Sequence, residues 1–255
     1  MVQSLPIFQR IIGSLASRLP AGSSSKQLMV DAVLWQLEEV TYSRLKNCGF
    51  RPGCVVDVGA HIGQWTRTTK SIFSDVPFVM IEARDEMRSD LERTATEFAD
   101  VKYHIALLGP KESAAAVFYT QGSASSLYRE RSDAPMTQTS LPMTTLDNIL
   151  STSTRAPLFL KLDLQGAELD VLRGGNATLK KTEIVQLEIA LLPYNDKAPT
   201  APEVITFMDK QGFAIYDIAG FIRPNGKDLV QLDVIFVRKT SNLRPNSFRF
   251  TNAPA

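Results

Sequence analysis

The residues of this chain best suited to chemistry begin with an acid and two glycines that directly follow a short apolar run. Residues 55–63 read VVDVGAHIG, so that Asp57 precedes Gly59 and Gly63. Glycines allow a tight turn and let a ligand approach the backbone without a Cβ in the way. An apolar strand that leads into a glycine turn and then a helix is typical of the first unit of a nucleotide-binding α/β fold.

A second acid, Glu82, follows the apolar run 78–81 and lies 19 residues after Gly63. At the end of the next strand, a carboxylate can accept hydrogen bonds from both hydroxyls of a ribose. The two segments together indicate a cofactor that carries a nucleoside.

Two classes of cofactor fit this arrangement. Dinucleotides favour G-x-G-x-x-G, in which the middle glycine lets the pyrophosphate touch the backbone. Here Ala60, His61 and Ile62 separate the glycines, and none of them is a glycine. Asp57 would repel a pyrophosphate but attract the ammonium and sulfonium of S-adenosylmethionine. The loop therefore favours S-adenosylmethionine over a dinucleotide, and a purely structural strand–helix turn is the third interpretation.

Seven apolar runs recur along the chain, and amphipathic segments separate most of them. Such alternation predicts a parallel sheet with helices on both faces. The connection 219–227 leaves no room for a helix, which predicts an antiparallel pair for the last two runs. We therefore predict an α/β fold of the class I (Rossmann-like) methyltransferase type: a mostly parallel seven-stranded sheet that ends in an antiparallel hairpin. The runs are 55–59, 77–82, 101–105, 158–163, 184–190, 213–218 and 232–237.

Residues 109–145 interrupt the alternation between the third and fourth runs. Residues 115–119 read as a short strand, and the stretch that follows, to Met143, is rich in Ser, Thr and Pro. Loops of this length are usually functional or disordered, and this one falls near the carboxyl ends of the strands, where ligands bind. We interpret it as part of the ligand site and as a candidate lid.

A second dense motif, KLDLQGAELDVLRG, occupies residues 161–174. Asp163 ends an apolar strand, Gly166 allows a turn, and Glu168 opens a helix, where the helix dipole favours an acid. Asp163 is therefore expected at the same sheet edge as Asp57 and Glu82. Three acids at the ends of strands are difficult to explain as solvated surface.

With both motifs taken together, the chain resembles the FkbM family of S-adenosylmethionine-dependent methyltransferases over roughly residues 54–238. The resemblance rests on four blocks in a fixed order, at residues 57–63, 145–147, 161–168 and 188–193. One difference is His61, where the family often has Asn. The resemblance implies O-methylation of a hydroxyl on a small molecule such as a sugar, a glycolipid or a polyketide-type metabolite.

The resemblance also implies roles for the residues that would bind the cofactor. The glycine loop would pass under the methionine part, with Asp57 near the ammonium, directly or through water. Glu82 would bind the ribose, and the two alanines that follow the second and third strands would border the adenine. The predicted cofactor-binding residues are Asp57, Gly59, Ala60, His61, Gly63, Glu82, Ala83 and Ala106.

Catalysis of this reaction requires a base, because a hydroxyl is a poor nucleophile until its proton leaves. A positioned base contributes about 100- to 10,000-fold. Asp163 is the first candidate, and Glu188 is the second because it lies within an apolar run. A buried carboxylate needs a partner, which Lys161 or Arg84 could provide. A structural ion pair is the alternative role for Glu188.

His61 and His104 are further candidate bases, although His104 is more typical of a core position. With these two histidines and no clustered cysteines, we predict no zinc site and no metal in the active site. A hard cation held by three carboxylates is a lesser alternative, on Asp163, Glu168 and Glu188.

The overall composition bears on partners and location. Formal net charge is +1 and basic residues are scattered, so the concentrated basic face of a nucleic-acid binder is not expected. Cys48 and Cys54 read as free thiols in a reducing compartment, and we expect a cytoplasmic protein.

We expect three segments: an N-terminal helical extension (1–50), a methyltransferase domain (51–240) and a C-terminal tail (241–255). The first 30 residues contain basic residues but no acid, and residues 5–19 carry apolar side chains at helical spacing. This extension could pack on the domain or on a second subunit of a homo-oligomer. It could instead lie on an anionic membrane surface through residues 1–19, or serve in targeting.

Two other functions remain open. A nicotinamide-dependent oxidoreductase is disfavoured by the missing middle glycine and by the terminal hairpin. A catalytically inactive, methyltransferase-like scaffold is disfavoured by the acids at three strand ends, because nothing structural requires them there.

Overall fold

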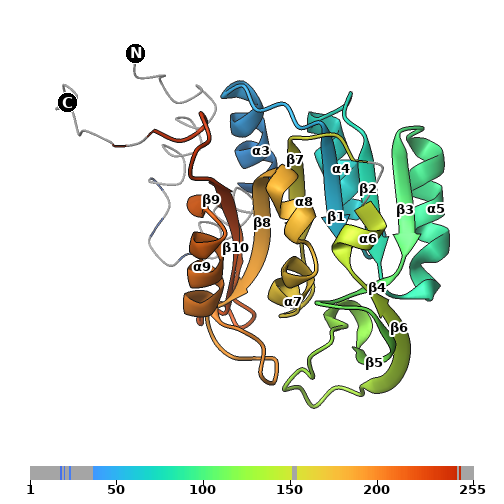
Figure 1. Ribbon diagram of the computed structural model, residues 1–255. Helices are drawn as coiled ribbons and strands as arrows, with labels where there is room; N and C mark the ends of the chain where they lie inside the picture. Colours follow the sequence, from blue (N-terminus) through green and yellow to red (C-terminus); the bar gives the residue numbers. More distant parts are fainter. Residues whose placement is uncertain are drawn as a thin grey trace.

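The computed structural model describes residues 37–150, 154–245 and 247, together with the single residues 18, 20 and 23. Its centre is a seven-stranded sheet with the strand order β3-β2-β1-β7-β8-β10-β9 (Figure 1). The strands are β1 (Cys54–Val58), β2 (Phe78–Glu82), β3 (Val101–Ile105), β7 (Leu158–Leu162), β8 (Thr182–Ala190), β9 (Phe213–Ile222) and β10 (Gln231–Arg238).

The direction of the strands confirms the predicted fold class. Strands β3, β2, β1, β7 and β8 pair in parallel, and β10 pairs antiparallel with both β8 and β9. The seven predicted apolar runs coincide with these seven strands. In β1, β2 and β7 every residue is buried, and strands covered on both faces read as continuous apolar runs in the sequence.

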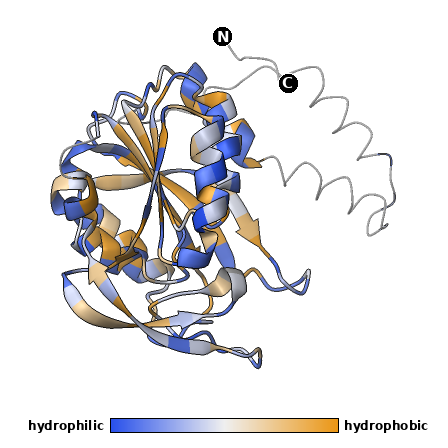
Figure 2. Cartoon of the chain, turned by 90° about the vertical axis from the view of Figure 1, so that its right-hand side faces the viewer, coloured by the Kyte–Doolittle hydropathy of each residue, from blue (hydrophilic) through white to orange (hydrophobic). Residues whose placement is uncertain are grey.

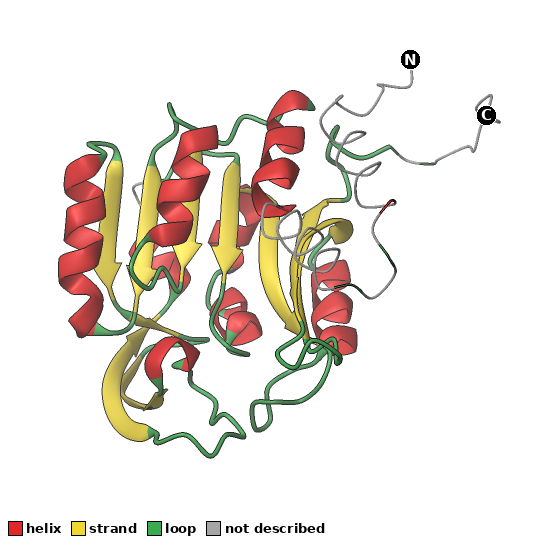
Figure 3. Cartoon of the chain, turned by 180° about the vertical axis from the view of Figure 1, so that it is seen from behind, coloured by secondary structure: helices red, strands yellow, loops and turns green. Residues whose placement is uncertain are grey.

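Helices cover both faces of the sheet, and Figure 3 shows the face opposite to that of Figure 1. One face is covered by α3 (Leu37–Asn47), α4 (Gln64–Ile72) and α5 (Arg88–Glu97). The other is covered by α6 (Leu146–Leu150), α7 (Glu168–Arg173), α8 (Asn176–Lys181) and α9 (Ala201–Lys210). Two short 3-10 turns follow β2 and β5, namely η1 (Asp85–Met87) and η2 (Gly122–Ala124).

The core divides into two apolar clusters, one on each face, because side chains alternate along a strand. Val56 and Leu160 pack under α6 to α9, whereas Val55 and Phe159 pack under α3 to α5. Figure 2 shows these hydrophobic strands enclosed by helices with hydrophilic outer faces. Both clusters reach the functional site, the first through Val58, Ile81 and Leu108 and the second through Trp65.

A second, three-stranded sheet lies beyond the carboxyl ends of the central strands (Figure 3). It consists of β4 (Leu107–Leu108), β5 (Ser113–Thr120) and β6 (Thr137–Thr144), with β6 in the middle. The strand expected at 115–119 is confirmed as part of β5. The interpretation of the whole stretch up to Met143 as loop is wrong, since β6 pairs with β5 over most of its length. Its threonines favour strands, but β6 has no buried face to produce an apolar alternation.

The N-terminal extension is described only from Leu37 onward. Helix α3 lies within the helical extension expected over residues 1–50. The apolar positions 5–19 and the tail from residue 248 lie outside the described residues. Within the described ranges, no helix has the length and apolar character needed to cross a membrane.

Gly59 offers a test of how tightly the glycine loop packs on β7. Its φ is +80°, and a Cβ there would lie 2.0 Å from the carbonyl oxygen of Asp163. We expect Gly59→Ala to lower the free energy of unfolding by clearly more than the roughly 1–2 kcal/mol that a left-handed backbone costs alone. Urea denaturation measures the difference.

Gly226→Ala is the matched control, because Gly226 has a φ of +69° and no atom within 4 Å of the added Cβ. It should show the backbone cost without the clash. An equal loss of stability in the two variants would contradict the close approach of the loop to β7.

Candidate functional site

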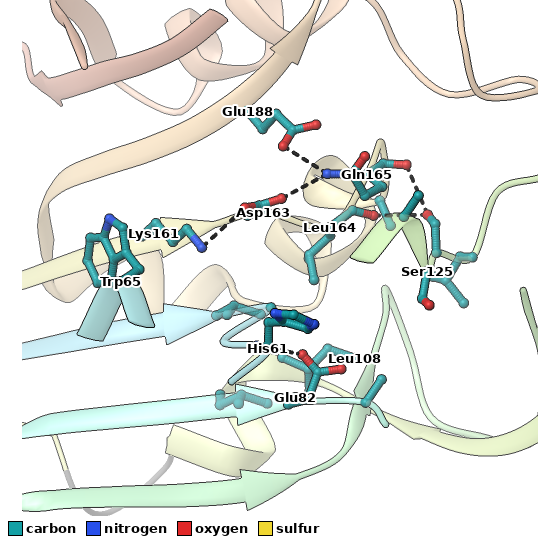
Figure 4. Close-up of a pocket in the computed structure, with 18 of the residues that line it drawn as sticks. His61, Trp65, Glu82, Leu108, Ser125, Lys161, Asp163, Leu164, Gln165 and Glu188 are labelled. Carbon is teal, nitrogen blue, oxygen red and sulfur yellow. Dashed lines mark hydrogen bonds and ion pairs between the residues drawn. The ribbon is translucent and has the colours of Figure 1, made fainter. Parts of the chain in front are cut away.

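A cavity of about 500 Å³ opens at the carboxyl ends of the central strands. In Figure 4, His61 and Glu82 lie on one side and Lys161, Trp65 and Glu188 on the other, with Asp163 between them. The predicted cofactor-binding residues divide into two groups. Those that line the cavity are Gly59, His61, Glu82, Ala83 and Ala106, whereas its described lining does not include Asp57, Ala60 or Gly63.

The glycine loop is fastened to β2. The backbone N–H groups of Gly59 and Ala60 both donate to the carbonyl of Ile81, at 2.9 and 3.1 Å. The next N–H, of His61, donates to Glu82 Oε2 at 2.9 Å. His61 has a φ of +50°, a conformation that is unfavourable for a residue with a side chain. The hydrogen bond to Glu82 helps to hold this conformation, which directs the His61 side chain into the cavity wall.

Glu82 is 6% exposed. Its carboxylate accepts hydrogen bonds from three N–H groups of the protein. Besides His61, the backbone N–H of Arg84 donates to Oε1 at 3.0 Å and its Nε at 3.3 Å. A carboxylate has about four acceptor positions, so Oε2 retains capacity for a hydroxyl donor. Arg84 Nη1 also donates to the carbonyl of Gly122 at 2.6 Å. This bond ties the cofactor side of the cavity to the segment 109–145, which supplies residues 118 and 124–127 to the wall.

Lys161 is buried between two carboxylates, with Nζ 3.3 Å from Asp57 Oδ1 and 3.4 Å from Asp163 Oδ2. Its ammonium also lies 5.5 Å from the centre of the Trp65 ring. Burial alone would lower the pKa of Lys161, but the nearby carboxylates raise it above its ordinary value. Lys161 is therefore a permanent cation in a region of carboxylates.

Asp57 lies one layer below the cavity and is 0% exposed. Its Oδ2 accepts a hydrogen bond from Thr66 Oγ1 at 2.8 Å, and its Oδ1 faces Lys161. Burial raises the pKa of Asp57, and the charge of Lys161 opposes that rise only in part. The contact observed for Asp57 is thus with Lys161 rather than with the cavity.

Asp163 and Glu188 are joined by the amide of Gln165, whose Nε2 donates to Asp163 Oδ1 at 3.0 Å and to Glu188 Oε2 at 2.9 Å (Figure 4). Tyr194 donates its hydroxyl to Glu188 Oε1 at 2.7 Å. Lys161 and Arg84, which the sequence offered as partners of Glu188, make ion pairs with other carboxylates. The register explains this difference for Lys161, because it lies directly opposite Asp57 on the neighbouring strand.

The two carboxyl groups have pKa values shifted in opposite directions. Burial raises the pKa of Asp163, but Lys161, Glu188 and Gln165 outweigh burial and leave it below its ordinary value. Burial and the negative charge of Asp163 hold the pKa of Glu188 well above its ordinary value. Asp163 is therefore the stronger acid of the two, and Glu188 holds a proton more readily.

Glu168 and His104 lie outside this arrangement. Glu168 Oε1 accepts the backbone N–H groups of Leu164 at 2.8 Å and Gly166 at 3.2 Å, and burial raises its pKa to about 7. Glu168 thus stabilises the turn after β7.

Within the described residues no group of three or more His, Cys, Asp or Glu could hold a metal ion. The three carboxylates considered as a cation site from the sequence do not form such a group, and the described cavity lining does not include His104.

Sequence reasoning missed a polar wall on the far side of the cavity. Gln186 Nε2 and Trp65 Nε1 both donate to Glu38 Oε1, at 2.8 and 3.1 Å. Gln231 and Asp233 line the same region from β10. One signal was available in the sequence. Gln186 stands two residues after the buried Ile184, and Asp233 stands two residues before the buried Ile235. In each strand a polar and an apolar side chain two residues apart are expected on the same face.

Comparisons with known proteins agree with this architecture. The family described as "Methyltransferase FkbM domain" matches residues 57–215. No curated protein matches the chain.

The chain is also similar to solved structures of methyltransferases. For magnesium protoporphyrin IX methyltransferase from Synechocystis PCC 6803 with bound SAM, the TM-score is 0.46 at 11% identity, over 93% of this chain and 100% of the other. For precorrin-6y C5,15-methyltransferase from Geobacter metallireducens GS-15, the values are 0.45 and 10%, over 79% and 88%. For TrmK of M. capricolum with S-adenosyl-homocysteine, they are 0.47 and 6%, over 78% and 66%. These likenesses are too distant to indicate an acceptor.

The Lys161–Asp57 pair gives a prediction about stability. Replacing Lys161 by Met leaves Asp57 without its cation, and we expect the free energy of unfolding to fall by about 3–5 kcal/mol. Burial raises the pKa of Asp57 above its unfolded value, so its ionised form is disfavoured by folding. The loss should therefore be larger at about pH 7 than at about pH 4, where the carboxyl is largely neutral.

The double variant Asp57→Asn/Lys161→Met is the control, because it removes both charges. It should be more stable than Lys161→Met alone. Urea denaturation of both at the two pH values decides the matter. A double variant that is no more stable than Lys161→Met would contradict the pairing.

Proposed function

Because the chain belongs to the FkbM methyltransferase family, whose methyl donor is S-adenosylmethionine, we propose that it is an O-methyltransferase acting on a hydroxyl of a small molecule. Acceptors of this kind include sugars, glycolipids and polyketide-type metabolites. The observation that carries the proposal is the Asp163 carboxylate in the cavity, with Lys161 Nζ 3.4 Å from Oδ2 and the Gln165 amide between it and Glu188. This carboxylate supplies a proton acceptor where a hydroxyl has to lose its proton.

The side of the cavity formed by the glycine loop and Glu82 offers an acceptor and surfaces that suit S-adenosylmethionine. Glu82 has remaining acceptor capacity for the ribose hydroxyls. The small side chains of Ala83 and Ala106 leave room for a flat base, and Gly59 lets the methionine part pass over the loop. Arg84 is the basic residue on this side of the cavity, and its guanidinium already binds Glu82 and the carbonyl of Gly122. It is therefore poorly placed to bind a pyrophosphate.

When bound, S-adenosylmethionine supplies a methyl group on a positively charged sulfur. Asp163 would accept the proton of the acceptor hydroxyl as its oxygen gains the methyl group, while the sulfur–carbon bond breaks and S-adenosylhomocysteine leaves. Lys161 keeps that carboxylate ionised before the reaction, and Gln165 fixes its orientation through Oδ1. Burial and the charge of Asp163 raise the pKa of Glu188, so Glu188 holds a proton more readily than Asp163. Holding the acceptor in place accounts for the larger share of the acceleration, for which orientation can supply roughly 7–11 kcal/mol.

Glu82→Ala tests the cofactor assignment. Hydrogen bonds to a charged group contribute roughly 1.5–3 kcal/mol, so we expect affinity for S-adenosylhomocysteine to fall at least about tenfold. Isothermal calorimetry measures the change, with NAD as the comparison ligand. Asp85→Ala, which removes an exposed acid just after the same strand, should leave the affinity unchanged. An unchanged affinity in Glu82→Ala would contradict the assignment, and binding of NAD alone would favour an oxidoreductase.

Asp163→Asn tests the base. We expect transfer of labelled methyl groups to hydroxyl acceptors to fall by about 100- to 10,000-fold, with affinity for S-adenosylhomocysteine retained. Asp170→Asn, on α7 outside the described cavity lining, is the control.

The pH dependence of the rate distinguishes the two acids. Because the pKa of Asp163 lies below its ordinary value, Asp163 should contribute no rise in kcat/KM near neutral pH. A rise through neutral pH that disappears in Glu188→Gln would instead make Glu188 the base.

A further inference from the structure

Four residues of the far wall come from elements that flank the range matched to the family. Glu38 comes from α3, Ile222 from the end of β9, and Gln231 and Asp233 from β10. All four lie outside residues 57–215, whereas the glycine loop and Glu82 lie inside that range. The cofactor side is thus common to the family, and the far wall is where this chain can select its own acceptor.

The neighbouring strands leave space for the Asp233 side chain in this wall. Asp233 lies directly opposite Glu188 on β8 and opposite Gly220 on β9. A Cβ on Gly220 would lie only 2.4 Å from Asp233 Oδ2, so the glycine leaves the space that the carboxylate occupies. The pairing of β9 and β10 is also irregular immediately after Asp233. Bulges next to active sites redirect a side chain.

The electrostatics of the wall disfavour an anionic ligand. Carboxylates of Glu38, Asp163 and Asp233 face the cavity there, and the ammonium of Lys161 is already engaged by Asp57 and Asp163. Burial raises the pKa of Asp233 to about 7, with further contributions from Asp163 and Glu38 that Lys161 opposes only in part. A carboxylate or phosphate on the acceptor would add another negative charge to this group.

The hydrogen-bonding character of the wall favours a ligand with several donors. Asp233 offers carboxylate oxygens, and the Gln231 amide lines the cavity two residues away on the same strand. Gln186 adds a second amide. Hydroxyl groups are the neutral donors that match these acceptors, and they also accept from the amides.

We propose that this wall is the acceptor subsite, that it takes a polyhydroxylated acceptor without an anionic group, and that Asp233 orients the acceptor by accepting a hydrogen bond from a second hydroxyl. The proposal rests on the function proposed above, because Asp163 then faces the hydroxyl that receives the methyl group. Asp233 is a specificity-determining residue in this arrangement.

The test uses the full chain loaded with S-adenosylhomocysteine and two probes that differ only at one carbon. Methyl glucopyranoside is neutral, and methyl glucuronide carries a carboxylate on the same ring. We expect saturation-transfer NMR titrations to show the neutral probe binding at least about tenfold more tightly, because like-charge contacts are costly. Equal binding of both probes, or no binding of the neutral one, would overturn the proposal.

Variants locate the effect at Asp233. Asp233→Asn, nearly unchanged in shape, should weaken binding of the neutral probe about tenfold and reduce the discrimination against the glucuronide. Gly220→Ala should do the same by displacing a carboxylate that is still present. Asp228→Asn, in the exposed turn between the same strands, is the matched control. Unchanged probe binding in Asp233→Asn and Gly220→Ala would overturn the role of Asp233.

Affinity for S-adenosylhomocysteine separates this inference from the proposed function. It should be the same in Asp233→Asn and the unmodified chain, since Asp233 lies on the far wall. Failure of the unmodified chain to bind S-adenosylhomocysteine would remove the proposed function and, with it, the acceptor subsite.

Discussion

Lys161 places a buried ammonium on a sheet face that otherwise carries carboxylates, and the geometry of the cavity follows from that contact. Burying an ion is costly unless it is paired and hydrogen-bonded. Lys161 meets this requirement with Asp57 below it and Asp163 above it. The same cation keeps Asp163 ionised, and it lies against the ring of Trp65. One side chain thus joins the core, the proposed base and the far wall.

The face on which Lys161 lies changes from apolar to polar along the strands, two residues at a time. Val55 is followed on the same face by Asp57, Phe159 by Lys161, and Ile184 by Gln186. The lower residues pack under α3 to α5, whereas Lys161 and Gln186 line the cavity and Asp57 lies just beneath it. Because adjacent strands are held in register by their hydrogen bonds, the polar groups take their spacing from the sheet. A site built on strands in this way is positioned more accurately than one built on loops.

The sequence predicted those parts of the molecule in which a local pattern coincides with a spatial one. Buried parallel strands appear as apolar runs, and Glu82 and Asp163 were found because each stands at the end of such a run. The partner of Lys161 was predicted wrongly because strand register, not sequence distance, places it beside Asp57. Glu38 and Asp233 were missed for a related reason, since α3 and β10 reach the cavity only through tertiary packing. Strand β6 was missed because it has no buried face.

Backbone strain is concentrated where the cavity needs side chains in fixed positions. Among the described residues, three non-glycine residues have positive φ, and two of them, His61 and Gln165, line the cavity. Each is held from a different element, His61 by Glu82 on β2 and Gln165 by Asn195, whose Nδ2 donates to its carbonyl at 2.6 Å. Strain of this kind persists only where the surroundings over-determine the conformation. The hydrogen bonds that offset this strain also hold the Gln165 amide between the two carboxylates. The strained turn thereby helps to position Asp163, the proposed base.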